Sequence, residues 1–402
     1  MTPLKWLRDL CAVAQAFDST IDTSAVVQGW QTKQPGDVLR IRSVPILTEI
    51  VANSAAAYHI LYRSTDSKND PSWAVTTLFI PESIDRAPSG KAPLLSYQFA
   101  YNTANLDSAP SFALSGVMAK SEPTLGIKSS TSLIDEMMAF GWIVNTPDQW
   151  GPTSAFGASI QGGRATLDAL KAAQYLLNLK KNPGYNTAIW GYSGGSIATF
   201  AAAELHKDYA PEVKIEGAVL GGLVDNISGD FDLMNKSPIA GTVIAFLLGV
   251  TSQYPEARKY LESRLVPATR AEFMSVLDLE LTQAVAHFSG HDIYPYFENG
   301  LQDLKVPQLQ ELFDKQAKLG HRGIPTMPMF VYKAIKDQFC PIAWTDATVQ
   351  KLCDAGAEIT FDRNEIENGK QRVFGFLGAI FEEGYGSTER CNVLDVWVDA
   401  SA

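Results

Sequence analysis

The chain has 402 residues, of which 46% are hydrophobic and 19% charged, proportions typical of a globular protein with a large core. Its 33 basic and 44 acidic side chains give a formal net charge of −11, which argues against nucleic acid or an anionic membrane as the main partner. The longest apolar run, residues 238–250, is too short to span a bilayer, so we expect no integral membrane segment.

The N-terminal segment, residues 1–17, reads as a helix in which charged residues interrupt the apolar ones. A secretory signal needs an uninterrupted apolar stretch, so we expect a cytoplasmic protein, with secretion as the alternative. The four cysteines, Cys11, Cys340, Cys353 and Cys391, lack the spacing of metal ligands, and we expect no metal site. A disulfide between Cys353 and Cys391 is one alternative, but four reduced thiols fit a cytoplasmic location better.

Short apolar runs separated by helical patterns follow along the chain. Residues 57–66 and 72–81 alternate in polarity, which predicts an antiparallel pair at the edge of a sheet. Five further strand-like runs are residues 93–101, 141–148, 187–193, 215–222 and 327–337. Because strands buried on both faces alternate here with helices, we predict an α/β fold with a mostly parallel sheet.

This alternation stops between residues 225 and 320, where helix-like segments show no clear strand. We therefore predict a helical cap over residues 225–320, inserted above the carboxyl edge of the sheet, where α/β proteins bind ligands. Residues 1–224 and 321–402 then form the two parts of the core.

One segment carries a specific chemical signal. Residues 188–200, "AIWGYSGGSIATF", fit the G-x-S-x-G pattern between a strand and a helix, which is typical of a nucleophile elbow. The turn would lift the Ser193 hydroxyl above the sheet. It would also aim the first amides of the following helix, Gly194 first, at a developing oxyanion.

Several ordered segments resemble the fungal secretory lipase family, whose members are α/β hydrolases with a helical cap. The resemblance rests on "AYHILYRSTD", "LLSYQFAYNTANLDSAPSFAL", "PDQWGPTSAFGASIQGGRATLDALKAA", the elbow, "YAPEVKIEGAVLGG" and "FVYKAIKDQFCPI". It implies that Ser193 is the nucleophile, that Gly194 donates to the oxyanion, and that Asp337 takes the place of the triad acid.

The chain departs from the family pattern near the expected oxyanion hole. Asn102 stands where the family usually has an aspartate, and Ser108 replaces a family cysteine. Gln149 and Trp150 stand where an aromatic and an acidic residue are common. We include Asn102, Tyr192 and Trp150 among the residues expected to line the pocket.

A larger departure concerns the triad base. The family histidine should fall between residues 364 and 368, but the chain has no histidine after His321. A serine hydroxyl normally needs a positioned imidazole to take its proton. His287 and His291, in the predicted cap, and Glu367, in the loop where the family histidine is expected, are the candidates for a substitute.

Three hypotheses follow. The first is a serine esterase or acyltransferase with a substitute base. The second, which the missing base slightly favours, is a non-hydrolytic enzyme of fungal secondary metabolism that cyclises, isomerises or eliminates at a carbonyl held by Ser193. The third is a non-catalytic binding protein. All three imply a small lipophilic partner bearing a carbonyl or an ester, and no cofactor signature is present.

Overall fold

The computed structural model describes residues 28–115, 125–178, 184–365, 370–386 and 390–396. Its central feature is a ten-stranded sheet with the order β1-β2-β3-β5-β4-β6-β7-β8-β9-β10. The strands are β1 (Val38–Ser43), β2 (Ser54–Thr65), β3 (Pro71–Pro81), β4 (Ala92–Gln98), β5 (Ile143–Pro147), β6 (Tyr185–Tyr192), β7 (Gly217–Gly221), β8 (Met329–Ala334), β9 (Ile359–Asn364) and β10 (Cys391–Val396).

The first three strands form an antiparallel edge, in which Tyr58 lies opposite Leu78 and Tyr62 opposite Ala74. This confirms the antiparallel pair predicted from residues 57–66 and 72–81. From β4 onward the neighbouring strands run parallel, and every residue of β4 and β5 is buried. Burial on both faces is typical of parallel strands, and this arrangement confirms the mostly parallel α/β sheet.

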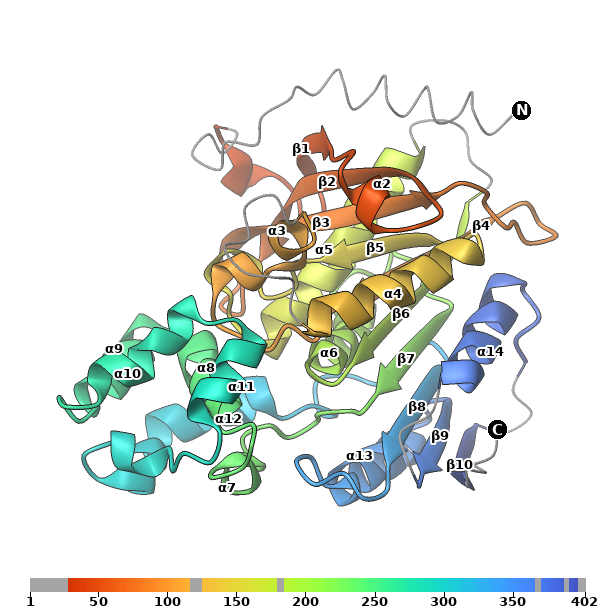
Figure 1. The fold of residues 1–402 in the computed structure, drawn as a ribbon. Helices are drawn as coiled ribbons and strands as arrows, with labels where there is room; N and C mark the ends of the chain where they lie inside the picture. Colours follow the sequence, from red (N-terminus) through yellow and green to blue (C-terminus); the bar gives the residue numbers. More distant parts are fainter. Residues whose placement is uncertain (1–27, 116–124, 179–183, 366–369, 387–389, 397–402) are drawn as a thin grey trace.

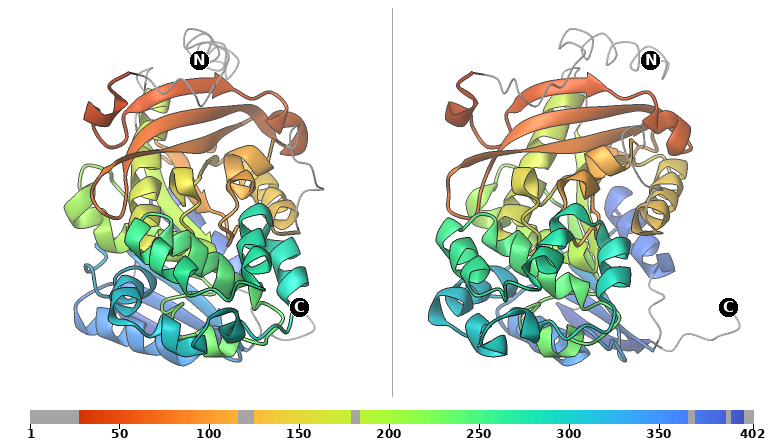
Figure 2. Two further views of the ribbon diagram at one scale, coloured as in Figure 1. Left: turned by 90° about the vertical axis from the view of Figure 1, so that its left-hand side faces the viewer. Right: turned by 60° about the vertical axis from the view of Figure 1, so that its left-hand side comes forward.

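Helices cover both faces of the sheet (Figures 1 and 2). Figure 1 shows α4 (Leu125–Ala139) and α14 (Lys370–Phe381) in front, with α5 (Ser159–Asn178) and α6 (Gly194–Tyr209) behind. The remaining helices of the core are α2 (Leu47–Ile50), α3 (Pro110–Ala113) and α13 (Ile342–Asp354), with the short 3₁₀ helices η1 (Trp30–Thr32), η2 (Leu106–Ser108) and η3 (Gly151–Thr153). The expected N-terminal helix lies outside the described residues.

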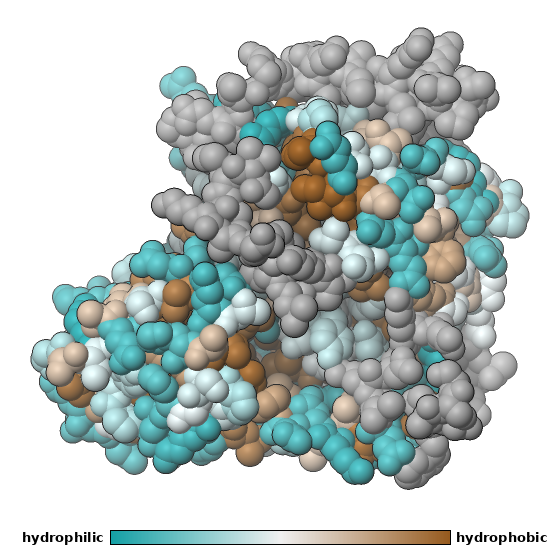
Figure 3. All heavy atoms as spheres, viewed as in Figure 1, coloured by the Kyte–Doolittle hydropathy of each residue, from teal (hydrophilic) through white to brown (hydrophobic). Residues whose placement is uncertain are grey.

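A helical insertion, residues 222–328, separates β7 from β8 and contributes no strand to the sheet in this described stretch. It holds α7 (Phe231–Met234), α8 (Gly241–Thr251), α9 (Pro255–Ser263), α10 (Arg270–Met274), η4 (Ser275–Asp278), α11 (Leu281–Phe288), η5 (Tyr294–Tyr296), η6 (Gly300–Leu304) and α12 (Pro307–Ala317). Every residue of α8 is buried, whereas the face of the insertion seen in Figure 3 carries many hydrophilic side chains among scattered apolar ones. The apolar run at residues 238–250 is therefore a core helix of the insertion.

A buried ion pair joins the end of the insertion to α6. Arg322 contacts Glu204 at 3.0 Å, and both side chains are almost fully buried. The backbone amides of His321 and Arg322 also donate to Glu204, and the Arg322 guanidinium donates to the Lys315 and Lys318 carbonyls. Since α6 begins at the nucleophile elbow, these contacts fix the insertion relative to Ser193.

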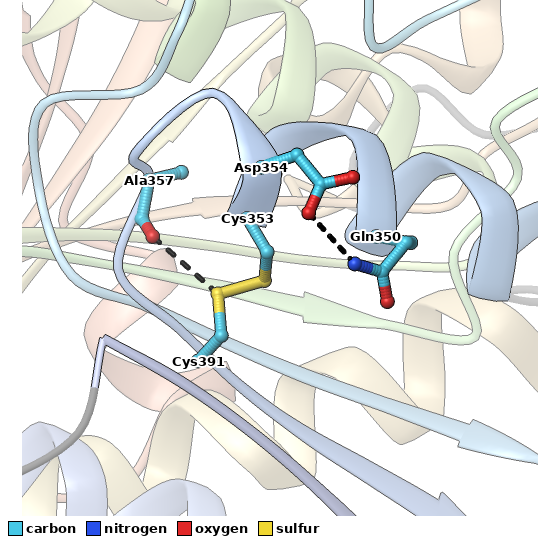
Figure 4. Close-up of a disulfide and its surroundings, with 5 residues drawn as sticks. All are labelled: Gln350, Cys353, Asp354, Ala357 and Cys391. Carbon is cyan, nitrogen blue, oxygen red and sulfur yellow. Dashed lines mark hydrogen bonds between the residues drawn. A yellow bond between two sulfur atoms is a disulfide. The ribbon is translucent and has the colours of Figure 1, made fainter.

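The structure corrects the expectation of four reduced cysteines. Cys353, in the last turn of α13, and Cys391, at the start of β10, form a disulfide (Figure 4). Cys340 is free and buried, and Cys11 lies outside the described residues. The pairing could not be derived from the spacing of 38 residues, because a disulfide requires two Cα atoms at about 4–7 Å. Here the folded chain holds them 5.9 Å apart.

Candidate functional site

Ser193 occupies a sharp turn between β6 and α6. Its backbone has φ 51° and ψ −125°, a conformation that residues other than glycine rarely adopt. The Ser193 amide donates to the Gly221 carbonyl at 2.9 Å, which ties the turn to the neighbouring strand β7. The strained turn leaves the side chain half-buried at the end of the sheet, which is the geometry of a nucleophile elbow.

The glycines around Ser193 are required by close approach. A Cβ atom at Gly191 would overlap with Thr199 and the Gly195 carbonyl, and one at Gly195 would overlap with the Gln98 carbonyl at the end of β4. These contacts let α6 start directly against the sheet. The N-terminal amides of α6 are therefore held next to the serine.

Asn102 lies directly over Gly194. A Cβ atom at Gly194 would overlap with the Asn102 side-chain amide, and the buried Asn102 Oδ1 has no hydrogen-bond partner among the described residues. Asn102 follows β4, in a loop held by several hydrogen bonds, including two from the segment after β5. Gln149 donates to the Phe99 carbonyl at 2.6 Å, and the Trp150 amide donates to the Tyr101 hydroxyl at 3.0 Å. The loop therefore places a polar group beside the first amide of α6.

A buried carboxylate anchors α3, the helix that follows this loop. Asp148 accepts hydrogen bonds from the Ser111 amide at 2.9 Å and from the Ser111 hydroxyl at 2.6 Å. Burial raises the pKa of Asp148 to about 7, and the bonds from Ser111 oppose that rise. The carboxylate thus links the end of β5 to α3, which continues from the Asn102 loop.

Ser193 opens into a cavity of about 370 Å³. The residues with polar or charged groups that line it are Asn102, Ser193, Gly194, Thr242, Lys336, Asp337, Gln338 and Cys340, with Tyr192 at the exposed edge. Apolar side chains complete the wall, namely Phe156, Ile197, Val224, Ile227, Met234, Ile239 and Phe339. Met234 and Ile239 come from the helical insertion, so the insertion and the core form the cavity together.

Asp337 follows β8 and lines the same cavity. Its Oδ1 accepts hydrogen bonds from the backbone amides of Phe339 at 2.9 Å and Cys340 at 3.0 Å. Its Oδ2 lies 3.8 Å from Nζ of Lys333, a fully buried lysine that donates to the Leu223 carbonyl at 2.5 Å. The carboxylate is therefore fixed through one oxygen, while the other faces a buried cation beyond hydrogen-bond distance.

Two further buried groups stand next to Asp337 and were not anticipated. Burial raises the pKa of Asp230 to about 7, although a hydrogen bond from Cys340 and the Lys333 charge oppose that rise. Burial also raises the pKa of the Cys340 thiol, so Cys340 keeps its proton. No sequence pattern marked Lys333 or Asp230, since Lys333 lies inside a strand and Asp230 in a polar turn.

The structure places the other candidates differently from expectation. Trp150, His287 and His291 are not among the residues that line the cavity. Trp150 is fully buried with its ring packed against Tyr101 and Phe156, because it follows β5 inside the core. Glu367 lies outside the described residues.

His287 and His291 belong to a polar cluster within the insertion. His287 lies 3.3 Å from Glu272, and His291 lies 3.0 Å from the Tyr296 hydroxyl, which itself donates to Glu272. The structure therefore does not place these two candidate bases at Ser193. Within the described residues, no group of three or more His, Cys, Asp or Glu side chains is arranged to hold a metal ion. No described helix is long and apolar enough to cross a membrane.

The fold and the elbow define an α/β-hydrolase with a serine at the nucleophile position. The chain belongs to the secretory lipase family, because the model of that family matches residues 117–378. This confirms the family resemblance that the sequence motifs indicated. The structure also superposes on Candida antarctica lipase A with a TM-score of 0.81, over 92% of this chain and 87% of that one, at 24% identity.

Two relatives carry names that specify an activity. A probable trichothecene esterase of Stachybotrys chartarum is 53% identical over 99% of this chain and 87% of that protein. A trichothecene C-3 esterase of Fusarium sporotrichioides is 39% identical over 92% of this chain and 85% of that protein. Relatives with these names favour the esterase hypothesis and give no support to the non-hydrolytic one.

The expectation of a cytoplasmic protein is wrong. The family is one of secretory lipases, and a secreted triacylglycerol lipase of Malassezia globosa is 31% identical over 83% of this chain. The disulfide agrees with this correction, since disulfides persist in oxidising compartments. The charged residues of the N-terminal segment, on which the cytoplasmic expectation relied, were a weak criterion by comparison.

Proposed function

We propose that the protein is a serine esterase that hydrolyses a carboxylic ester of a lipophilic small molecule, with trichothecene esters as the substrate class. The observation that carries this proposal is the strained Ser193 turn at the base of a mainly apolar cavity. A binding pocket has little need for backbone strain of this kind, whereas a nucleophile must be lifted clear of its strand. The names of the two esterase relatives support the choice of substrate.

The proposed chemistry uses groups that the site brings together. The Ser193 oxygen attacks the ester carbonyl, and the Gly194 amide at the start of α6 stabilises the negative charge that develops on the carbonyl oxygen. Asn102, which lies over Gly194, orients the carbonyl. The apolar wall formed by Val224, Ile239 and Phe339 holds the lipophilic part of the substrate.

The test is hydrolysis of a trichothecene acylated at C-3 by the purified full chain, followed by liquid chromatography and mass spectrometry. We expect release of the free alcohol and the acid by the wild type and none above background by Ser193→Ala. A product with the mass of the substrate would instead indicate isomerisation. Tributyrin, offered in parallel, distinguishes a general lipase from an esterase that prefers the trichothecene.

A further inference from the structure

All five histidines of the chain lie in described segments, and none lines the cavity that contains Ser193. His59 is buried against Arg42, and burial lowers its pKa to about 3. His206 contacts the Val213 carbonyl at 2.5 Å. His321 is exposed at the end of the insertion, while His287 and His291 share the Glu272 cluster. The base that activates Ser193 is therefore not a histidine.

Among the described residues, four titratable side chains other than histidine line the cavity: Tyr192, Lys336, Asp337 and Cys340. The Tyr192 ring stacks on Tyr332 at the exposed edge. Lys336 carries an ammonium group, 3.9 Å from Glu365, that has no lone pair to accept a proton. Cys340 keeps its proton, because burial raises the pKa of its thiol. Among the described side chains that line the cavity, Asp337 is the remaining proton acceptor.

The contacts of Asp337 suit that role. Two backbone amides hold its Oδ1, so the carboxylate cannot rotate freely. Its Oδ2 makes no hydrogen bond with the described part of the chain and retains its lone pairs. The Nζ atom of the buried Lys333 lies 3.8 Å from this oxygen. Likewise, the Ser193 hydroxyl makes no hydrogen bond within the described residues.

We propose that Asp337 is itself the general base for Ser193 and acts through one water molecule in the cavity. Ser193 and Asp337 line the same cavity without a hydrogen bond between them, and a carboxylate can act on a hydroxyl through one intervening water. The backbone amides of Phe339 and Cys340 fix the orientation of the carboxylate. The inference rests on the proposed esterase function.

In the proposed reaction, Ser193 is first acylated by the ester and is then released by water. The Ser193 proton moves through the water to Asp337 Oδ2 while the serine oxygen bonds to the ester carbonyl carbon. The tetrahedral intermediate then expels the alcohol, which takes the proton from Asp337. A second water, deprotonated by Asp337, cleaves the acyl-serine bond. The acid leaves and Ser193 regains its proton, so the net reaction is ester plus water to alcohol plus acid.

The test measures the rate at which a fluorophosphonate labels Ser193, followed by intact mass, because labelling reports serine activation without requiring the natural substrate. We expect Asp337→Asn and Asp337→Ala to label about 10²- to 10⁴-fold more slowly than the wild type. Formate, a small carboxylate that fits the vacated space, should accelerate labelling of Asp337→Ala at least about tenfold. Asp346→Asn, which changes a carboxylate paired with Arg363, is the matched control and should stay within about twofold.

Three outcomes would overturn the inference. One is labelling of Asp337→Asn as fast as the wild type, and another is a folded wild type that is not labelled at all. The third is strong acceleration of wild-type labelling by added imidazole, because that would show that no base acts on Ser193. Labelling that depends on Asp337 without hydrolysis of the trichothecene ester would refute the proposed substrate but support the base. Equal melting temperatures of the variants exclude loss of folding as the cause.

Discussion

The disulfide between Cys353 and Cys391 should stabilise the fold, and the size of this effect on the free energy of unfolding follows from the length of the segment that it closes. It closes a segment of 38 residues that contains β9, α14 and the start of β10. In the chain-entropy description, a loop of this length restricts the unfolded state by about 4 kcal/mol at 25 °C. We therefore expect the double substitution Cys353→Ala with Cys391→Ala to lower the free energy of unfolding by up to about 4 kcal/mol.

The corresponding shift in melting temperature is modest because the chain is long. At about 2.1 cal/mol/K per residue, unfolding of 402 residues has an entropy near 0.8 kcal/mol/K, so the melting temperature should fall by about 5 °C. Scanning calorimetry measures this shift in melting temperature. The samples are the wild type, the double variant and the wild type with dithiothreitol. Reduction should reproduce the effect of the double variant, while dithiothreitol should leave the double variant unchanged.

A double variant that melts within about 1 °C of the wild type would contradict the expected stabilisation by the disulfide. Iodoacetamide modification, followed by intact mass, then distinguishes two explanations. If Cys353 and Cys391 react without prior reduction, the bond does not form in solution. If they react only after reduction, the bond exists but closes a segment that unfolds independently of the rest of the sheet.

Three further predictions concern backbone strain, pH and charge burial. Because Ser193 has φ 51°, Ser193→Gly should be more stable than Ser193→Ala by about 1 kcal/mol or more in urea titrations, and an equal stability would argue against strain at the turn. Burial raises the pKa of Asp148 from 3.8 to about 7, so the folded state keeps a proton that the unfolded state loses between these pH values. The free energy of unfolding should therefore fall as the pH rises from 3.8 to 7, by about 4 kcal/mol at most. Asp148→Asn should remove that part of the pH dependence. The measurement is the difference in free energy of unfolding between pH 5 and pH 8, taken for the wild type and for the variant. Arg322→Met leaves the buried Glu204 carboxylate without its cation and should cost about 3–5 kcal/mol in the same titration, whereas Lys318→Met at an exposed pair should cost under about 1 kcal/mol.

The strands predicted from sequence were those with strong local patterns. β4 to β8 are short, mostly buried runs rich in apolar residues, and β2 with β3 alternates in polarity, so each is visible in a short window. The last strands lack such a signal. β9 carries Asp362, buried because it pairs with Arg372 of α14 at 2.7 Å, and β10 is a partly exposed edge strand. Their strand character depends on partners distant in the sequence.

The elbow was predictable for the same reason, since glycines around a serine between strand and helix encode the turn within five residues. The sequence alone also established that no histidine follows His321. Only the tertiary structure decided what that absence means. It places every histidine away from Ser193, and it brings Asp337 from the end of β8 into the cavity, next to the buried Lys333. Local patterns determine turns and strands, whereas the neighbours of a charged side chain depend on how distant segments pack.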